Sequence, residues 1–258
     1  MPPSQAAQTL PFTPLPDSLS ILADTLFPQS LATVITLSLS HLSHQTTATL
    51  AHWLHEHELT RLSEFKFEKR HREWLGGRIC AKQTLYLFLQ QAGKSSSYPQ
   101  HHQYRVASEE SGRPYFPQLD DVDFSLPRLS ISHSKEYATA LISRSHCGID
   151  IQYPAESLER VKKQFTNANE EQLILQSLPK LQPIARLAMI WTGKEAIKKM
   201  LSPTGMPGFH QLRLTKIIQH KRTDAVLYFT ETDKYHTTFP VVAGILSTGY
   251  SLALCCQT

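Results

Sequence analysis

A stretch near the start of the last quarter of the chain constrains the fold most, because it has the spacing of one amphipathic helix. Residues 191–200 read Trp-Thr-Gly-Lys-Glu-Ala-Ile-Lys-Lys-Met. Apolar residues at helical spacing are expected to face a core, namely Leu187, Ile190, Ile197 and Leu201. Thr192, Glu195 and Lys199 fall on a stripe predicted to point away from that core. Glu195 and Lys199 would then be i,i+4 neighbours, and on a solvated helix such a pair stabilises by about 0.2–0.5 kcal/mol.

A second stretch, about forty-five residues upstream, gives this helix another interpretation. Residues 148–152 read Gly-Ile-Asp-Ile-Gln and are predicted to end an apolar strand. A carboxylate in that position needs a counter-charge, hydrogen bonds or a metal. If the helix packs beside the strand, Asp150 and Glu195 form a hard oxygen site suited to Mg²⁺, whose remaining ligands would be waters and substrate phosphates. Lys199, one turn further along the helix, would reach those phosphates. Such a group suits phosphoryl transfer, in which catalysis is mostly positioning and charge neutralisation.

Composition sets the class of protein. The 258 residues, 41% hydrophobic and 19% charged, fit one large or two modest globular domains rather than a disordered or fibrous chain. The net charge of +4 is too small to indicate nucleic acid but leaves room for a local basic site. The four cysteines form no metal-binding pattern, and we expect buried free thiols in a reducing compartment. We infer no export signal and no membrane span, which together predict a cytoplasmic protein.

Taken in order, the chain predicts three segments: a proline-rich lead-in at 1–30, an N-terminal subdomain at 31–145 and a C-terminal subdomain at 146–258. The lead-in shows no period and is expected to lie on the surface. Alternation or apolar runs predict strands at 31–39, 104–107, 129–134, 137–142, 148–151, 225–230, 241–245 and 250–256. Helices are expected over 50–62, around 78–89, at 158–165 and 169–178, and after Pro183, with a cap at Thr166-Asn167 and loops at 94–99 and 203–208.

One region of the N-terminal subdomain, residues 61–82, is rich in positive charge. Its basic residues are Arg61, Lys66, Lys69, Arg70, Arg72, Arg78 and Lys82, against Glu64, Glu68 and Glu73. Each alone is best explained as part of a solvated helix. As a cluster with Gly76-Gly77, they indicate phosphate contact, because glycines let the backbone approach a ligand closely. Arg113, held in a Gly-Arg-Pro turn, is either ordinary hairpin chemistry or a second anion-binding arm.

A paired signature and three stretches upstream of it resemble the Sfp-type 4'-phosphopantetheinyl transferase family. The paired signature is Gly-Ile-Asp-Ile at 148–151 followed by Trp-Thr-Gly-Lys-Glu-Ala-Ile-Lys-Lys at 191–199. Upstream, residues 72–78 with Lys82 are similar to the family's basic helix segment, Gly112-Arg113-Pro114 to its Gly-Lys-Pro turn, and residues 130–134 to its Asn-Ile-Ser-His-Ser stretch. The resemblance implies a monomeric α+β fold of two similar α/β subdomains in a pseudo-twofold arrangement, with the active site in the cleft between them.

The resemblance also implies an activity and roles for single residues. The enzyme would transfer 4'-phosphopantetheine from coenzyme A to a serine of an acyl, peptidyl or aryl carrier protein of fatty-acid, polyketide or nonribosomal peptide synthesis, releasing adenosine 3',5'-bisphosphate. Asp150, Glu195 and Lys199 match catalytic residues, and Asp150 and Glu195 match Mg²⁺ ligands. The matching coenzyme A contacts are Arg78, Lys82, Arg113, Ser132, His133 and Lys199.

One departure from the family pattern concerns the metal. Where the family usually has Glu after Gly-Ile-Asp-Ile, this chain has Gln152. Gln152 lies two residues along the strand from Asp150 and so faces the same side. Its amide oxygen can ligate Mg²⁺ but brings no charge and cannot act as a base. We expect an active enzyme with a two-carboxylate site.

Other functions remain open at this level. A relative that binds coenzyme A or a carrier protein with weak or no transfer is supported by Gln152. A nucleic-acid binder using residues 61–82 is disfavoured by the interleaved glutamates. His133 alone is best explained as a satisfied polar residue, and Trp191 as core packing. The remaining histidines near the first helix are assigned to a solvated face: His41, His44, His52, His55 and His57.

Overall fold

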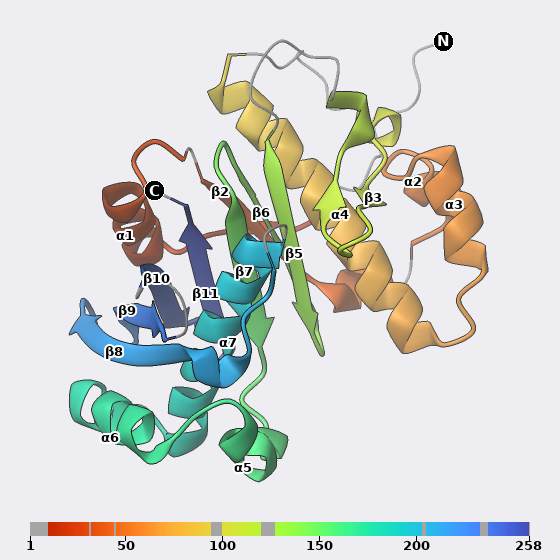
Figure 1. Ribbon diagram of the computed structural model, residues 1–258. Coiled ribbons are helices and arrows are strands. Elements are labelled where there is room, and N and C mark those ends of the chain that lie inside the picture. The colour runs from red at the N-terminus through yellow and green to blue at the C-terminus, as the bar shows by residue number, and fades with distance from the viewer. Residues whose placement is uncertain are drawn as a thin grey trace.

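The computed structural model describes residues 10–30, 32–43, 45–93, 100–119, 127–202, 205–232 and 237–257. Two antiparallel sheets and a two-stranded hairpin carry helices packed against them (Figure 1). The α+β class predicted from the sequence is confirmed. The predicted loop at 94–99, residues 203–204 of the next loop, and His44 lie outside the described residues.

The first sheet has the strand order β1-β2-β6-β5. Its strands are β1 (Thr13–Pro14), β2 (Thr33–Ser38), β5 (Arg128–Ser134) and β6 (Tyr137–Ser143). The long helix α4 (Glu68–Gln91) packs against β2, β5 and β6. Gly76 makes this contact close, because a Cβ there would lie 2.2 Å from Leu39 Cδ2 and 3.1 Å from the Cβ of Ala138. Gly76 therefore serves helix-to-sheet packing rather than the phosphate approach predicted for the glycine pair.

The second sheet has the order β7-β11-β10-β9-β8. Its strands are β7 (Cys147–Gln152), β8 (Leu212–Gln219), β9 (Asp224–Glu231), β10 (Thr238–Ile245) and β11 (Ser251–Cys256). Helix α7 (Pro183–Leu201) lies across β7, β10 and β11. The remaining hairpin pairs β3 (Ala107–Ser108) with β4 (Pro114–Tyr115), with Gly112 at φ +83° in its turn.

Shorter helices complete the fold. The α-helices are α1 (Asp17–Leu26), α2 (Thr47–Leu50), α3 (Glu56–Ser63), α5 (Ser157–Val161) and α6 (Ala168–Ser177). The 3-10 helices are η1 (Leu39–Leu42), η2 (His101–Gln103), η3 (Pro117–Leu119), η4 (Lys162–Gln164) and η6 (Phe209–Gln211). The cap predicted before α6 is confirmed: Asn167 Oδ1 accepts from the backbone N–H of Glu170 at 3.1 Å, and the Glu170 carboxylate accepts from that of Asn167 at 3.1 Å.

Three secondary-structure predictions were wrong. The lead-in contains α1, which is tied to the second sheet by a hydrogen bond from Ser18 Oγ to Asp224 Oδ2 at 2.6 Å. Leu19, Leu22, Ala23 and Leu26 have helical spacing and pack in or against the core, a pattern that the surrounding prolines obscured in the sequence. Strand β8 was missed because charged residues interrupt its apolar pattern. Residues 104–106 carry no regular structure, and β3 begins only at Ala107.

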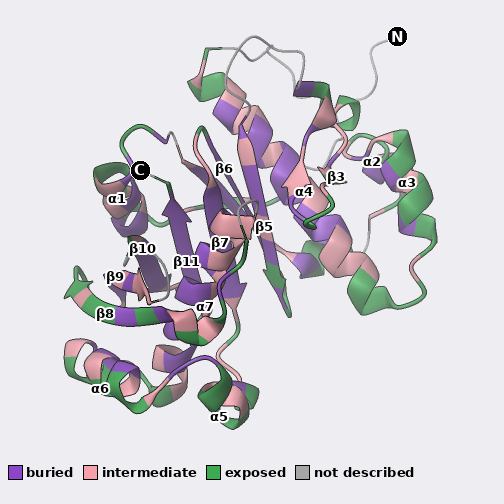
Figure 2. Ribbon diagram, viewed as in Figure 1, coloured by how far each residue is buried: buried purple, intermediate pink, exposed green. Residues whose placement is uncertain are grey.

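Two apolar clusters form the core, one around each main sheet. Figure 2 shows buried residues concentrated along β6, β7 and β11. All four cysteines are buried and free, as predicted, and burial raises the pKa of the Cys80 thiol. No helix within the described ranges is long and apolar enough to cross a membrane.

The contact between α7 and β7 is close enough to fix both elements. A Cβ on Gly148 would lie 1.9 Å from the carbonyl oxygen of Ala196, so only glycine lets the strand backbone approach the helix there. Thr192, which was predicted to point away from the core, is fully buried, and its hydroxyl lies 2.9 Å from Ser251 Oγ. The helix is buried on more than one face because the sheet, α5 and α6 all pack against it.

Candidate active site

The centre of the site is an ion pair between β7 and α7. Lys199 Nζ lies 2.8 Å from Asp150 Oδ1, and the Asp150 side chain is only 9% exposed. Ser132 of β5 donates its hydroxyl hydrogen to the same carboxylate oxygen at 2.7 Å. The Lys199 ammonium also donates to the carbonyl oxygens of Ile149, at 2.9 Å, and Ile131, at 3.3 Å. The buried strand-end carboxylate thus has the counter-charge that the sequence requires of it.

Glu195 lies one turn before Lys199 but does not pair with it. Its Oε1 accepts from Lys198 Nζ at 3.1 Å, an i,i+3 contact. The predicted Glu195 to Lys199 pair is therefore corrected, because Asp150 on the neighbouring strand provides a more buried partner for Lys199. Lys198, which sequence reasoning passed over, also lies over the Phe209 ring at 3.9 Å from its centroid.

Gln152 shares a strand face with Gly148 and Asp150, and that face meets α7. The Gln152 amide nitrogen donates to the carbonyl oxygen of Tyr153 at 2.9 Å. With the nitrogen engaged, its amide oxygen is the atom left for a ligand.

Two adjoining pockets extend from this centre toward the first sheet. The smaller, about 160 Å³, is lined by Arg113, Lys199, Ser202 and Met206, among others. The larger, about 240 Å³, is lined by Arg70, Glu73, Trp74, Arg78 and His133, among others. Both pockets share Gly112, Pro114 and Ile131 in their walls. Together they form one groove that begins at Lys199 and continues along β5 to α4, and we call it the β5 groove.

Buried polar atoms along the β5 groove lack partners. Among the described side chains that line it, Arg78 Nε and Ser202 Oγ are buried without a hydrogen-bond partner. Burial lowers the pKa of Arg78, and its guanidinium lies over the Trp74 ring at 4.5 Å from the centroid. Native proteins rarely leave such groups unsatisfied, so a polar ligand fits this groove. Ser202 was missed because a serine just after a helix has no distinctive pattern.

His133 and Arg113 lie on opposite sides of the shared wall. His133 is partly exposed, 3.8 Å from Glu73, and burial lowers its pKa while Glu73 opposes that shift. Arg113 is buried, and its Nη1 lies 3.0 Å from His146 Nδ1. Burial also lowers the pKa of Arg113, and the Glu109 carboxylate opposes that change. Both side chains line the β5 groove.

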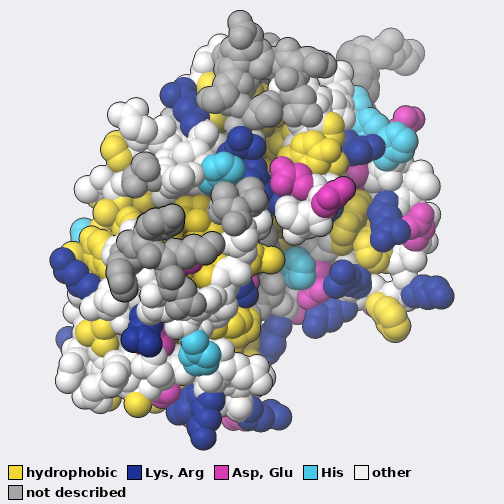
Figure 3. All heavy atoms as spheres, viewed as in Figure 1, with side chains coloured by type: hydrophobic (Ala, Val, Ile, Leu, Met, Phe, Trp, Pro, Cys, Tyr) yellow, Lys and Arg dark blue, Asp and Glu magenta, His cyan; other side chains and the backbone are white. Residues whose placement is uncertain are grey.

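Lys82 lies apart from these residues. Its side chain has no exposed surface and pairs with Glu58 of α3, and its ammonium donates to the carbonyl oxygen of Trp53 at 2.8 Å. Burial lowers the pKa of Lys82, and Glu58 opposes that shift. These contacts give Lys82 a structural role. Figure 3 shows Lys and Arg side chains interspersed with Asp and Glu over the region of α3 and the start of α4.

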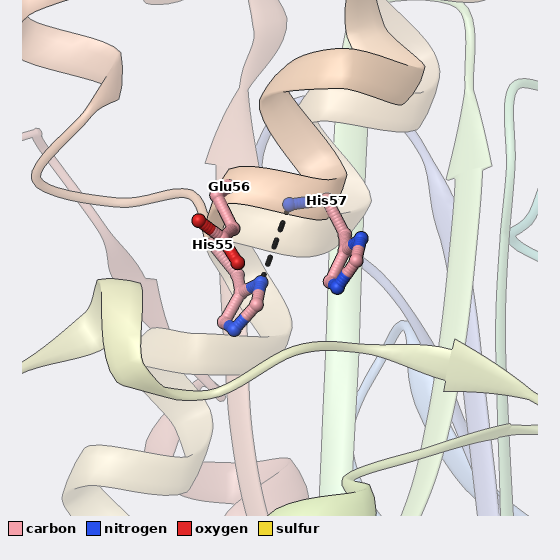
Figure 4. A group of neighbouring side chains, drawn as sticks. All are labelled: His55, Glu56 and His57. Carbon is pink, nitrogen blue, oxygen red and sulfur yellow. Dashed lines mark hydrogen bonds between the residues drawn. The ribbon is translucent and has the colours of Figure 1, made fainter.

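A histidine group on α3 is the one described set of three or more His, Cys, Asp or Glu side chains with ligand atoms within 4.8 Å of one another. It consists of His55, Glu56 and His57 (Figure 4). His55 is the N-cap of α3, and its Nδ1 accepts from the backbone N–H of His57 at 3.3 Å. Because Nδ1 is the acceptor, a neutral His55 carries its proton on Nε2. A metal would need the lone pair of Nε2, which that proton occupies. We assign the group to helix capping.

The arrangement thus combines a buried carboxylate, a lysine and a groove lined with basic side chains, which is the class of site that handles phosphate groups. Residues 146–255 match the model of the 4'-phosphopantetheinyl transferase superfamily. The matched segment includes Asp150, Gln152, Glu195 and Lys199. None of the curated proteins matches the sequence.

Only part of the candidate site lies within the matched segment. The similarity to the superfamily covers residues 146–255, which is less than half of the chain. The groove residues upstream of 146 lie outside the match and enter the site through their geometry alone: Arg78, Arg113, Ser132 and His133.

Proposed function

We propose that the protein transfers 4'-phosphopantetheine from coenzyme A to a serine of an acyl, peptidyl or aryl carrier protein, as an Sfp-type enzyme does. The observation that carries this proposal is the Asp150 to Lys199 pair at the mouth of the β5 groove, within the segment that matches the superfamily. The serine oxygen forms a bond to the β-phosphorus of coenzyme A. The bond from that phosphorus to the bridging oxygen breaks, and adenosine 3',5'-bisphosphate leaves.

The β5 groove is the proposed place for coenzyme A. Arg78, Arg113 and His133 line it and are proposed to bind its phosphates, and Lys199, whose ammonium hydrogens are held by the protein, adds positive charge beside them. The unsatisfied Arg78 Nε and Ser202 Oγ give the polar parts of the ligand two further partners. Lys199 would neutralise charge on the leaving group. Lys82, predicted as a further contact, is left out of the proposed site because its ammonium is fully buried.

We propose Mg²⁺ as the metal of this site because of the chemistry of its donor atoms. Asp150 and Glu195 supply carboxylate oxygens and Gln152 an amide oxygen, a donor set typical of a hard cation. When bound, the metal would neutralise charge on the phosphates. Glu195, with one oxygen on Lys198, is proposed to accept the serine proton as well.

We also propose that the chain consists of two similar subdomains, at 31–145 and 146–258, with the site between them. In each, a strand comes first, a long helix follows short ones, and later strands complete an antiparallel sheet. In both sheets the first strand of the subdomain pairs with its last strand, which pairs with its penultimate strand. The partial orders are β2-β6-β5 in one sheet and β7-β11-β10 in the other.

A buried ion pair in each subdomain supports this correspondence. The long helices carry Lys82 and Lys194, which pair with Glu58 and Glu170. Each glutamate completes the capping box of its short helix. Each also accepts a backbone N–H from a later segment: Glu58 from Val106 at 3.0 Å, and Glu170 from Leu214 at 2.8 Å.

The proposal predicts that the purified chain, with coenzyme A and Mg²⁺, loads apo carrier proteins. Mass spectrometry should show one phosphopantetheine added at the carrier serine and release of adenosine 3',5'-bisphosphate. A monomer in the cytoplasm is the proposed working form. Absence of loading across a panel of acyl, peptidyl and aryl carriers would contradict the transferase.

A second candidate, a relative that binds coenzyme A or carrier with weak transfer, is favoured by Gln152. Gln152→Glu should lower the Mg²⁺ concentration for half-maximal loading by about 10-fold, because a third carboxylate adds charge to the metal site. The measurement is an Mg²⁺ titration of the loading rate. Gln164→Glu adds the same charge on the exposed surface of η4 and should leave the titration unchanged. Loading by Gln152→Glu alone, with none by the wild type, would support the second candidate.

A further inference from the structure

The edge strands of the two main sheets meet along a line of serine hydroxyls. On β5, Ser130 Oγ accepts from the backbone N–H of Ile149 at 3.1 Å, and Ser132 Oγ from that of Ile151 at 3.2 Å. Ser134 Oγ accepts from the N–H of Tyr153 at 3.0 Å. Because each serine bonds a residue nineteen positions later, β5 and β7 run side by side in the same direction. We call the three hydroxyls the serine seam.

Ser132 differs from the other described contacts of the seam because its hydroxyl also reaches a carboxylate. It donates to Asp150 Oδ1 at 2.7 Å, in a site where the Ser132 residue is only 6% exposed. Since Oγ accepts from the N–H of Ile151, the hydroxyl hydrogen is directed at Asp150. The orientation of that hydroxyl is therefore fixed by the backbone of the strand that carries the carboxylate.

Lys199 completes the arrangement from the other side. Its three ammonium hydrogens have acceptors on both strands: Asp150 Oδ1, the Ile149 carbonyl and the Ile131 carbonyl. One carboxylate oxygen of Asp150 is thus held by two donors from different elements. The orientation of its second oxygen follows from that of the first.

We propose that Ser132 is a positioning residue that orients the Asp150 carboxylate for a divalent cation, rather than a contact of coenzyme A. This inference rests on the proposed function for the identity of the metal site. Residues that hydrogen-bond a metal ligand fix its orientation, and their loss costs about 10- to 100-fold in metal affinity or activity. Ser134 makes the same backbone bond without a carboxylate contact among those described, so it is the matched control.

The test compares Ser132→Ala with Ser134→Ala in the full chain. Ser132→Ala should lower kcat for carrier loading and weaken Mn²⁺ binding, each about 10- to 100-fold, with the KM for coenzyme A nearly unchanged. Mn²⁺ is the probe because it suits the same oxygen ligands and its binding is measured by electron paramagnetic resonance. Ser134→Ala should lower the melting temperature as much as Ser132→Ala does. It should leave kcat for carrier loading and the affinity for Mn²⁺ near their wild-type values. Equal effects of the two variants would show a purely structural seam and overturn the inference.

A second pair of variants isolates the hydroxyl. Ser132→Thr and Ser132→Val have nearly the same shape, and both suit a strand, but only threonine can donate to Asp150. Threonine should keep most of the Mn²⁺ affinity, and valine should lose it. Equal Mn²⁺ affinity in the two would contradict the positioning role even if Ser132→Ala does not fold.

Mn²⁺ binding separates the two proposals. A wild type that binds Mn²⁺ but loads no carrier contradicts the transferase, and the serine variants still decide the role of Ser132. A wild type that binds no Mn²⁺ contradicts the role of Ser132 at a metal site, whether or not it loads a carrier.

Discussion

Glu195→Gln should lower the rate of carrier loading by about 10³-fold while leaving the fold intact. A positioned general base typically contributes 10²–10⁴-fold, and the same change removes a charged metal ligand. Glutamine keeps the shape of the side chain and an oxygen, so the loss reports charge and basicity rather than packing. The measurement is the single-turnover rate with saturating coenzyme A and carrier.

Stability gives this prediction an internal check. The Glu195 contact with Lys198 is a partly exposed i,i+3 pair, which contributes at most about 1 kcal/mol. The melting temperature of Glu195→Gln should therefore stay close to that of the wild type. Loss of carrier loading with an unchanged melting temperature would show that the substitution affects the catalytic step rather than the stability of the fold.

A control variant is available on α5. Glu159 forms an equally simple i,i+3 pair with Lys162, at 2.6 Å, and lies outside the β5 groove. Glu159→Gln should change the loading rate by no more than about 2-fold. Loading by Glu195→Gln within 10-fold of wild type would contradict the base and metal roles, and a nucleic-acid binder would show no sensitivity to the change.

The helical and sheet elements that carry the site were largely predictable from the sequence, because their patterns are local. The alternating serines of β5, the apolar run of β7 and the capping residues of α6 each indicate structure within a few positions. The superfamily match at 146–255 agrees with the paired signature that suggested the family resemblance. Helix α1 was missed although Leu19, Leu22, Ala23 and Leu26 have helical spacing, because the prolines on both sides favoured a segment without regular structure.

The contacts made by each charged side chain were not predictable in this way. Lys82, Lys194 and Lys199 look alike in the sequence, yet two are fully buried in separate ion pairs and the third lies at the groove. Which partner each lysine finds depends on the placement of strands and helices that lie 24 residues apart in the chain for Lys82 and 49 residues apart for Lys199. The hydrogen bond from Ser132 to Asp150, eighteen residues later, was likewise not predictable from the local sequence.

The largest effect on stability should come from Glu170→Gln, which we expect to lower the free energy of unfolding by about 3–5 kcal/mol. Lys194 and Glu170 are both almost fully buried and lie 2.8 Å apart. Removing the charge of one partner leaves the other buried without compensation. In the wild type, Glu170 Oε1 accepts from the backbone N–H of Leu214, and Glu170 Oε2 accepts from that of Asn167. A glutamine side chain has only one oxygen, so its NH₂ group would face one of these two N–H donors.

The neighbouring residue provides the matched control. Glu171 lies on the same helix, is about one-third exposed and pairs with Lys162 at 3.1 Å. Glu171→Gln removes the same charge from a solvated pair and should cost less than about 1 kcal/mol. Denaturant unfolding of the two variants measures the difference directly. A loss below 1 kcal/mol in Glu170→Gln would show that the buried pair contributes little beyond its own desolvation.

The pH dependence of Glu170→Gln should identify Lys194 as the cause. Burial lowers the pKa of Lys194 in the folded protein, and Glu170 opposes that shift, so losing Glu170 lowers the pKa further. Between that value and the unfolded value of about 10.4, the unfolded chain binds more protons than the folded one. The free energy of unfolding then rises with pH. Glu170→Gln should therefore regain stability relative to wild type between pH 7 and about 10, whereas a loss due to packing alone would be the same at every pH.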